Sequence, residues 1–318
     1  MNLKALRAFR LIVERGSLSV ASSVLGLSQP ATSRLVAMLE DELNLKLFDR
    51  SGRTLRVSES GAAFYAGTKH ILAGLDEIPQ IAKDIQTGEK QFKLLTTHRI
   101  AQGLVSPTLA RLRKDRPKIR FSVDVLSRFE LDNLIGMRRF DLAIASLPVT
   151  HALIEIENHA MFRVRLEAVL PRSHRLAAQK TVTAADLSGE DLIGLWPDQL
   201  WRQQLNDFLR AGGETGRYVV ETRSSLMAWQ MAADGVGIAV FDRLCARGFD
   251  LDSIVFRPLE PARWIQFGYI HHRGHSLSRN AKEFLDYLRA AISDFQRASS
   301  ENAASVEFLS DDAATVDV

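Results

Sequence analysis

Apolar residues at the N-terminal end recur at intervals of three and four positions, which is the spacing of one face of a helix. These residues are Leu3, Leu6, Phe9, Ile12 and Val13. Gly16 is suited to end that helix, and Ser17 is a favourable N-cap for a short second helix that Gly26 ends. Ser28 caps a third helix, with Pro30 in its first turn, where a missing N–H is harmless. The pattern predicts a helix followed by two helices joined by a tight turn.

The predicted third helix carries polar side chains of the types that read the major groove of DNA. A Gln side chain bonds the edge of adenine and an Arg side chain that of guanine, while hydroxyl groups anchor phosphates. The expected DNA contacts on this helix are Ser28, Gln29, Pro30, Thr32, Ser33 and Arg34. The same residue types also make an ordinary solvated helix face, so the interpretation depends on the segment that follows.

Residues 47–57 are predicted to form a hairpin that turns at Ser51 and Gly52. A basic wing beside a reading helix holds phosphates or enters a minor groove. The basic residues around the tip of this wing are Arg50, Arg53 and Arg56. Within residues 1–58, nine basic residues face five acidic ones, a surplus that suits a module for binding a polyanion.

Residues 59–86 are predicted to form one long helix with an apolar seam that repeats every seven positions, as in a coiled coil. The seam residues, which we expect to join two copies of the chain, are Phe64, Ile71, Leu75, Ile78 and Ile85. Packing of this helix against its own domain is the alternative, because several glycines and Pro79 weaken an isolated coiled coil. Residues 87–89 are expected to act as a hinge.

Residues 16–40, together with residues 47–50 and 54–61, closely resemble the winged helix-turn-helix of LysR-type transcriptional regulators. The resemblance implies recognition contacts, with the two arginines on the wing side, at Gln29, Pro30, Ser33, Arg34, Arg50 and Arg53. Leu35 departs from the family pattern, in which this position is often polar. Altered contacts with the DNA site are one explanation and extra packing is another, and we favour packing. The resemblance also implies a linker helix and assembly as a dimer or a dimer of dimers.

From about residue 92 onward, short apolar segments alternate with helical patterns, which indicates a mainly parallel α/β sheet. The expected strands are residues 92–97, 119–125, 141–145, 164–170, 192–195, 218–221, 237–241, 254–258 and 264–270. The expected helices are residues 104–114, 131–138, 198–211, 226–233 and 278–295. The resemblance implies a two-lobed fold like that of a periplasmic binding protein, with a ligand cleft between the lobes and the last elements returning to the first lobe.

These expectations divide the chain into four parts. They are a winged helix-turn-helix (1–58), a linker and dimerisation helix with a hinge (59–88), a two-lobed effector-binding domain (89–297) and a tail (298–318). Lobe I takes about residues 91–163 and 267–297, and lobe II about residues 164–266. The tail holds five acidic residues, no basic residue and few apolar ones, so we expect it to be disordered.

Ligands of such sheets bind beyond the carboxyl ends of the strands, where loops and helix N-termini converge. The side chains expected in the cleft are Thr97, His98, Ser127, Arg128, Ser146, Trp201 and Asp242. Hydroxyl and helix N–H groups suit a carboxylate, Arg128 adds positive charge, and Asp242 suits an ammonium group. This combination suggests a carboxylate or amino-acid-like effector. Trp196 is available to wall the cleft beside Trp201 but is expected in the core.

The sequence lacks the signatures of common enzyme classes. The Gly-Val-Gly at residues 235–237 lacks the third glycine of a dinucleotide fingerprint, and no Gly-Lys-Ser/Thr, His-Glu-x-x-His or Gly-x-Ser-x-Gly motif occurs. His271, His272 and His275 have no Asp or Glu beside them in the sequence, which favours a solvated loop over a metal site. Cys245 is expected as a buried filler. We therefore expect no catalytic residue, cofactor or metal.

A chain of 318 residues suggests two or three folding units, and its single cysteine excludes a disulfide scaffold, which favours a reducing cytoplasm. No signal peptide is evident and no stretch approaches the ~18 apolar residues of a membrane span, so no membrane association is expected. We predict a cytoplasmic, homo-oligomeric LysR-like regulator that binds double-stranded DNA, a small-molecule effector and RNA polymerase. The alternatives are a metabolic α/β enzyme with an accessory DNA-binding head and a solute-binding protein of the transport class.

Overall fold

The computed structural model describes residues 2–51, 54–68, 78, 82, 91–135, 140–149, 155–246 and 252–310. These residues belong to two compact units, one built on residues 1–88 and the other on residues 89–135 and 140–318. Within the described ranges, no helix is long and apolar enough to cross a membrane.

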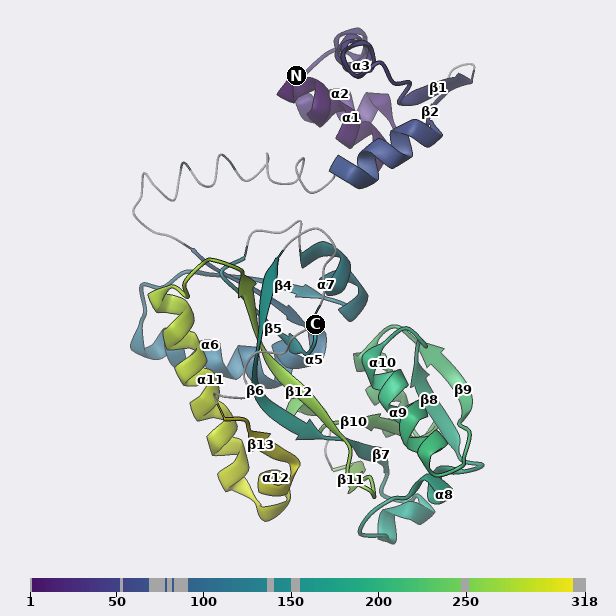
Figure 1. Ribbon diagram of the computed structural model, residues 1–318, viewed down its shortest axis with the longest axis vertical. Helices are drawn as coiled ribbons and strands as arrows, with labels where there is room; N and C mark the ends of the chain where they lie inside the picture. The colour runs from purple at the N-terminus through teal and green to yellow at the C-terminus, as the bar shows by residue number, and fades with distance from the viewer. Residues whose placement is uncertain are drawn as a thin grey trace. The chain divides into compact units, whose positions relative to one another are not determined.

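The described part of the first unit contains a helix-turn-helix followed by a hairpin (Figure 1). Its elements are α1 (Leu3–Arg15), α2 (Leu18–Leu25), α3 (Gln29–Leu43), β1 (Phe48–Ser51) and β2 (Thr54–Val57), after which residues 59–68 are helical. Ser17 and Ser28 cap α2 and α3 as predicted, since each hydroxyl oxygen accepts from the backbone N–H three residues later. Gly16 and Gly26 end their helices at a φ of 65°, a conformation that costs glycine little.

The ring of Phe9 lies at the centre of the core of this unit. Its centroid is 5.6 Å from that of Phe48 on β1 and 5.4 Å from that of Phe64 in the helix after the hairpin. Gly61 allows that helix to approach closely, because a Cβ there would lie 2.1 Å from the carbonyl oxygen of Leu47. The hairpin and the following helix are therefore held against α1.

The hairpin turns one residue later than the sequence predicted. Its antiparallel register pairs Ser51 with Thr54, so the connection is made by residues 52–53, which lie outside the described residues. Phe48 pairs with Val57 in this register and is buried. A slip by one residue would turn Phe48 away from the core, so its burial determines the register.

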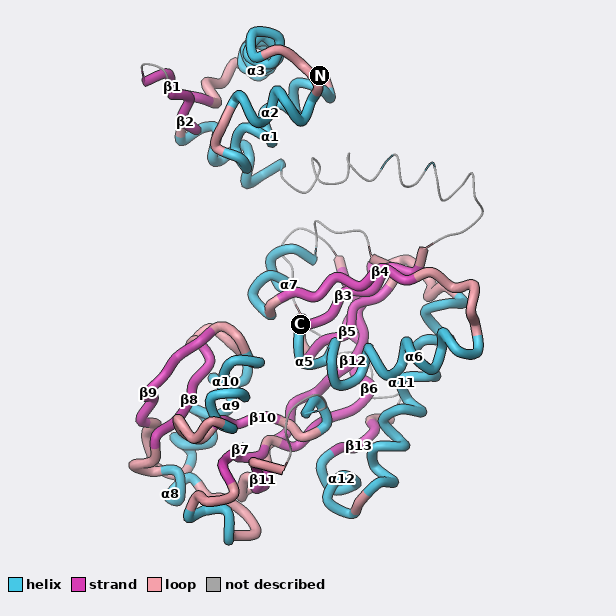
Figure 2. Tube along the Cα trace, turned by 180° about the vertical axis from the view of Figure 1, so that it is seen from behind, coloured by secondary structure: helices cyan, strands magenta, loops and turns pink. Residues whose placement is uncertain are grey.

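The second unit consists of two lobes, and a six-stranded sheet forms lobe I (Figures 1 and 2). The strand order is β13-β6-β12-β5-β3-β4. The strands are β3 (Phe92–Thr97), β4 (Phe121–Leu126), β5 (Leu142–Ser146), β6 (Ile156–Arg165), β12 (Trp264–His272) and β13 (Val306–Phe308). The helices are α5 (His98–Ile100), α6 (Ser106–Asp115), α7 (Arg128–Leu134) and α11 (Arg279–Ala298), with a π-helical segment (Ala101–Val105) between α5 and α6.

This sheet is mixed, in contrast to the mainly parallel sheet that the sequence predicted. β3 is parallel to β4 and β5, whereas β12 is antiparallel to β5 and β6. The chain leaves lobe I through β6 and returns through β12, so these neighbours run in opposite directions. The first half of β6 was missed because it contains three consecutive polar residues, Glu157, Asn158 and His159, whereas the prediction relied on apolar runs.

Lobe II contains two small sheets. β7 (Glu167–Pro171) lies between β10 (Ala239–Phe241) and β11 (Ile254–Pro258), antiparallel to both, while β8 (Asp191–Leu195) pairs in parallel with β9 (Arg217–Thr222). The α-helices of the lobe are α8 (Ala184–Leu187), α9 (Leu200–Ala211) and α10 (Ser225–Ala233). Buried residues of both lobes, such as Phe162 and Trp229, belong to one continuous core, which ties the two lobes together.

The segment after residue 298 is ordered up to residue 310, which corrects the prediction of a disordered tail. Ser300–Ser305 form α12, and β13 then pairs with β6, where Val306 is buried. Glu301 lies 2.7 Å from Arg243 in an ion pair. The tail has too few apolar residues to fold alone, but the edge of β6 supplies backbone partners and a place to bury Val306. Residues 311–318 lie outside the described residues.

Candidate functional site

The N-terminal half of α3 presents most of the side chains expected to contact DNA. Ser28, Gln29, Pro30 and Arg34 are exposed, and Ser33 is half-buried. The Nε of Arg34 lies 3.4 Å from the carbonyl oxygen of Pro30, so this guanidinium lies along the helix. The exposed face occupies the end of the helix that contacts base edges in helix-turn-helix proteins.

Thr32 does not belong to this exposed face, contrary to the sequence prediction. Its side chain is fully buried, and its hydroxyl oxygen lies 2.9 Å from that of Ser22 on α2 and 3.1 Å from the carbonyl oxygen of Ser28. Position 32 lies four residues before Val36 and seven before Leu39, both of which are buried, so Thr32 belongs to the buried face of α3. Leu35 is half-buried and packs against the core of the unit, as its assignment to packing requires.

Glu40 links the reading helix to the hairpin. Its Oε1 accepts hydrogen bonds from the backbone N–H groups of Leu47 at 2.7 Å and Phe48 at 3.1 Å. These are the residues at which the chain enters β1, so the carboxylate holds the start of the wing beside α3. A charged acceptor on backbone N–H groups makes a strong hydrogen bond, which fixes the two elements relative to each other.

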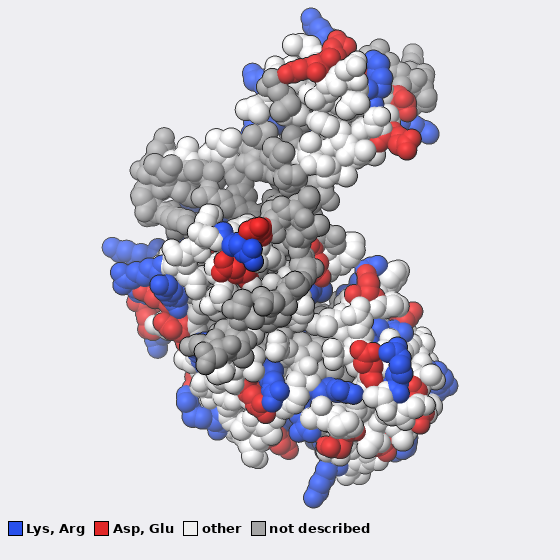
Figure 3. All heavy atoms as spheres, in the orientation of Figure 1, with Lys and Arg blue, Asp and Glu red and all other residues white. Residues whose placement is uncertain are grey.

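The wing arginines are only partly described. Arg56 lies on β2 opposite Asp49, and its side chain is exposed. Arg50 lies on β1, but its side chain is outside the described residues, as is the whole of Arg53. Basic and acidic side chains are interspersed over the face shown in Figure 3, so charge alone marks no binding surface on that face.

The linker residues expected to join two copies are also only partly described. Phe64 contacts Phe9 in the core of the first unit, so that contact accounts for its partial burial. Ile78 is helical and 52% exposed, which leaves a large apolar side chain facing solvent in a single chain. The other seam residues, which lie outside the described residues, are Ile71, Leu75 and Ile85.

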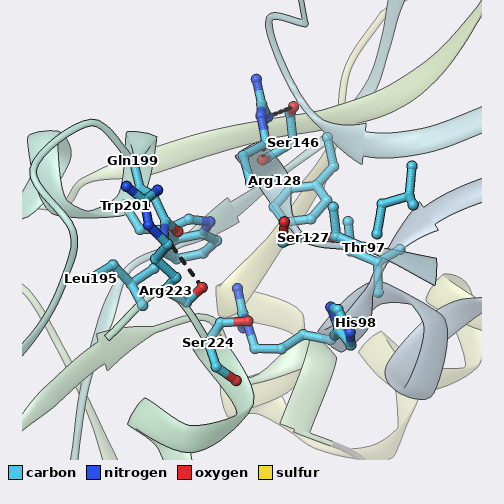
Figure 4. A pocket seen from close by; sticks show the side chains of 15 residues that line it. Thr97, His98, Ser127, Arg128, Ser146, Leu195, Gln199, Trp201, Arg223 and Ser224 are labelled. Atoms are coloured by element: carbon cyan, nitrogen blue, oxygen red, sulfur yellow. Dashed lines mark hydrogen bonds between the residues drawn. The ribbon is translucent and has the colours of Figure 1, made fainter. Parts of the chain in front are cut away.

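A cavity of about 250 Å³ lies between the two lobes (Figure 4). Of the residues expected in the cleft, those that line it are Thr97, His98, Ser127, Arg128, Ser146 and Trp201. Their loops follow β3, β4, β5 and β8, which confirms that the carboxyl ends of the strands converge here. Lining residues that the sequence analysis missed include Arg99, Arg223, Ser224 and Ser225, whereas Gln199 belongs to the expected loop between Trp196 and Trp201.

Arg128 is held by its own lobe. Its Nε donates to both carboxylate oxygens of Asp132, at 2.8 and 3.0 Å, and its Nη1 donates to the Ser146 hydroxyl at 2.9 Å. Burial raises the pKa of Asp132, although the neighbouring Arg128 acts to lower it. Ser127 caps α7 by accepting from the backbone N–H of Glu130. Arg128 therefore forms part of the cleft wall. Its positive charge is already partly neutralised by Asp132.

Asp242 does not line the cavity, which corrects its assignment as an ammonium acceptor. It is 1% exposed, its Oδ2 lies 2.7 Å from Nη1 of Arg99, and its Oδ1 accepts from the backbone N–H of Cys245 at 2.8 Å. The guanidinium of Arg99 also lies 4.6 Å from the ring centroid of Trp201. Cys245 is buried as predicted, and burial raises the pKa of its thiol well above the usual range. The Asp242 carboxylate is therefore bonded to buried groups of the protein and does not face a ligand in the cavity.

Arg223 is the main cleft residue that the sequence analysis missed. Its guanidinium carbon lies 4.0 Å from the ring centroid of Trp196 in lobe II and 5.1 Å from that of Phe129 in lobe I. Trp196 is 44% exposed, so its assignment to the core is wrong. Arg223 lies two residues after the predicted strand 218–221 and directly after the observed β9, so the rule that found the other loops also applied here. The three side chains bridge the two lobes.

One of the histidines at the end of β12 lies beside an acidic residue on the neighbouring strand, which the sequence did not reveal. His271 lies 3.6 Å from Glu157 and 3.0 Å from His159, both on β6. The prediction of a solvated loop without a nearby acid is therefore wrong for His271. His272 instead packs its ring against Phe140, with centroids 4.5 Å apart.

Two family models match the chain. One, described as LysR substrate binding domain, matches residues 86–293, and the other, described as bacterial regulatory helix-turn-helix protein, lysR family, matches residues 3–62. The chain is 27% identical over 297 residues to regulatory protein NocR of Agrobacterium fabrum (strain C58), covering 93% of this chain and 97% of that protein. It is 28% identical over 297 residues to transcriptional activator protein LysR of Escherichia coli (strain K12), with coverage of 92% and 94%.

The fold is also similar to that of a solved regulator. Full-length CbnR complexed with its target DNA matches with a TM-score of 0.68 at 19% sequence identity, covering 92% of this chain and all of the CbnR chain. At this identity the comparison concerns the fold alone.

Proposed function

The chain belongs to the LysR family of transcriptional regulators, and from this premise we propose which of its residues read DNA and what class of effector it senses. As a member of this family it combines a DNA-binding helix-turn-helix with an effector-binding domain. The family consists of regulators, so the alternative of a metabolic enzyme with a DNA-binding head is set aside. The helix-turn-helix match over residues 3–62 likewise removes the alternative of a solute-binding protein.

For DNA recognition, we propose that Gln29, Ser33 and Arg34 contact base edges or adjacent phosphates in a major groove. The observation that carries this proposal is the exposed polar face at the N-terminal end of α3. Ser28 and Pro30 lie at the same end and are proposed to contact the DNA backbone. We assign phosphate contacts to the wing arginines Arg50, Arg53 and Arg56, and Thr32 no direct contact.

For the effector, we propose a small carboxylate, with amino acids as one group within that class. The described lining residues include three arginines and several hydroxyl groups but no carboxylate. Arg223 is the cation best placed to turn toward a ligand, because its ion pair with Asp198 is 3.3 Å long and both side chains are more than 40% exposed. An exposed pair of this kind contributes little to stability, so a ligand carboxylate can replace Asp198 at small cost.

Closure of the lobes on this ligand is proposed to change the geometry of a dimer or a dimer of dimers on DNA. RNA polymerase is the proposed protein partner, and the cytoplasm is the compartment in which DNA and polymerase are available. Ile78→Asp tests the linker contact, because an exposed seam residue made charged should yield monomers by light scattering. Met227→Asp, at an exposed position of α10, serves as the matched control. Unchanged mass for Ile78→Asp would remove the linker from the interface.

Competition binding tests the DNA-reading function. Purified full-length protein is mixed with a labelled duplex from the region upstream of its own coding sequence and challenged with unlabelled specific or random duplex. We expect random duplex to compete at least ~10³-fold more weakly, as is usual for specific regulators. Equal competition by both duplexes would overturn the proposal.

A thermal-shift screen tests the effector class separately. Carboxylates, amino acids and neutral analogues are added to the wild type, Arg223→Ala and Arg210→Ala, the last being an exposed arginine of the same lobe. A bound carboxylate should raise the unfolding midpoint of the wild type and Arg210→Ala but have less effect on Arg223→Ala. Stabilisation by neutral analogues alone would reject the carboxylate.

A further inference from the structure

We propose that Glu157, His159 and His271 form a binding site for a divalent transition-metal ion of the zinc class on the sheet of lobe I. Glu157 and His159 are two residues apart on β6, so their side chains lie on the same face of the sheet. His271 on β12 is the direct cross-strand partner of Glu157 in the antiparallel register. The fold therefore gathers on one face two histidines that are 112 residues apart in the sequence.

The three ligand atoms have the spacing that a metal ion requires. Nε2 of His159 lies 3.0 Å from Nε2 of His271, and Oε2 of Glu157 lies 3.5 and 3.6 Å from these two nitrogens. Ligand atoms held at ~2.0–2.2 Å from a tetrahedral Zn²⁺ ion are separated by about 3.3–3.6 Å. Small side-chain adjustments therefore bring all three atoms into contact with one ion.

The donor types and their exposure also suit zinc. Two imidazoles and one carboxylate are borderline ligands of the kind that binds Zn²⁺ or Co²⁺, whereas Mg²⁺ and Ca²⁺ prefer oxygen donors alone. The side chains of His159, His271 and Glu157 are 21%, 12% and 32% exposed. The three side chains are therefore partly accessible to water, which would supply the fourth ligand of a tetrahedral ion.

Neighbouring groups orient both histidines for metal binding. Nδ1 of His271 lies 3.0 Å from the carbonyl oxygen of His272, so a proton on Nδ1 is donated there and Nε2 keeps its lone pair. The ring of His159 is stacked on that of Tyr269, with centroids 4.7 Å apart and an interplanar angle of 10°.

A hydrogen-bonded cluster without metal is the competing explanation. One Nε2–H donating to the other Nε2 also accounts for a distance of 3.0 Å between them. The two explanations differ in their response to zinc. A bound ion would connect β6, through which the chain leaves lobe I, with β12, through which it returns, and would stabilise the folded protein.

The test uses the untagged full-length chain, stripped of metal by a chelator. Zn²⁺ affinity and stoichiometry are measured by competition with a chromogenic chelator, and coordination is read from the visible spectrum of the Co²⁺ form. We expect one ion per chain and the intense absorption of four-coordinate Co²⁺. His159→Gln and His271→Gln should each weaken binding by more than the ~10–100-fold typical of losing an outer-shell partner.

His275→Gln is the matched control, because this exposed histidine lies near the same strand end but outside the proposed ligand set. It should retain wild-type affinity, and Zn²⁺ should raise the unfolding midpoint of the wild type and of His275→Gln but not that of His271→Gln. Circular dichroism of the metal-free variants checks their folding. Substoichiometric binding by the wild type, a Co²⁺ spectrum without the four-coordinate band, or equal loss in His275→Gln would overturn the proposal, whether or not a ligand variant folds.

Discussion

Arg99 and Asp242 form a buried ion pair that joins the two lobes beside the cleft. Nη1 of Arg99 on α5 lies 2.7 Å from Oδ2 of Asp242, which follows β10, and both side chains are less than 10% exposed. The guanidinium also lies over the rings of Trp201 and Phe241, at 4.6 and 4.5 Å from their centroids. One face of the cleft is therefore built on a charge pair that has little contact with water.

Asp242→Asn should destabilise the second unit strongly. The substitution leaves the guanidinium of Arg99 buried without its counter-charge, a loss that typically costs about 3–5 kcal/mol of unfolding free energy. Urea denaturation measures this change. Asp198→Asn, which removes the partner of the exposed Arg223, is the control and should cost less than ~1 kcal/mol. Similar small losses for both variants would mean that the buried pair contributes little.

Thr32→Val should reduce stability without changing which DNA sequence is bound. The Thr32 hydroxyl is buried between α2 and α3, and losing its hydrogen bonds is expected to cost about 0.5–1.5 kcal/mol. Ser33→Ala, at the neighbouring half-buried position, should alter DNA affinity and leave the unfolding midpoint nearly unchanged. Chemical denaturation and DNA titration of both variants measure the two effects. Altered sequence preference in Thr32→Val would restore its assignment as a contact residue.

Arg34→Ala and Arg56→Ala should weaken DNA binding in different ways. Loss of a base contact by Arg34 should cost about 1–3 kcal/mol for the specific sequence and less for others. Loss of a phosphate contact by Arg56 should weaken all sequences alike and lower the slope of log affinity against log salt by about 1. Titrations at several salt concentrations with specific and random duplexes distinguish the two. Identical behaviour would contradict the roles assigned to helix and wing.

Removal of residues 300–318 should destabilise the second unit. The truncation exposes the edge of β6, uncovers the site where Val306 is buried, and removes Glu301 from Arg243. We expect a lower unfolding midpoint and faster hydrogen exchange in β6. Removal of residues 311–318 alone is the control. If both truncations leave hydrogen exchange in β6 unchanged, the pairing of β13 with β6 does not stabilise the second unit.

The contribution of Glu301 should disappear in acid. The hydrogen bond from Arg243 lowers the pKa of this carboxyl below its usual value of 4.5. The unfolded chain therefore takes up the proton first as pH falls, so the stabilisation is complete above about pH 4.5 and is lost as pH drops through the folded-state pKa. Thermal unfolding of the wild type and Glu301→Gln at several pH values should show a gap that closes in acid. A constant gap would mean that the charge is not responsible.

Much of the effector cleft could be predicted because strand ends have a local signature. Thr97, Ser127 and Ser146 each follow or end a short apolar run, and parallel strands bring such ends together. A short apolar run of this kind also precedes Arg223, so this cleft residue could have been predicted in the same way. Asp242 also follows such a run, yet its side chain turns inward to Arg99, and no pattern along the chain indicates that choice.

The amino-acid sequence was sufficient for the helix-turn-helix of the first unit. Caps such as Ser17 and Ser28, and the glycines that end each helix, act on backbone groups within four residues, so the information is local. Contacts between distant residues required the folded chain. The meeting of His159 with His271, the inward turn of Asp242 and the docking of β13 depend on which strands become neighbours and in what register. The pairing and register of the strands are determined by the packing of the whole core, because apolar residues from many segments become buried only when the complete arrangement forms.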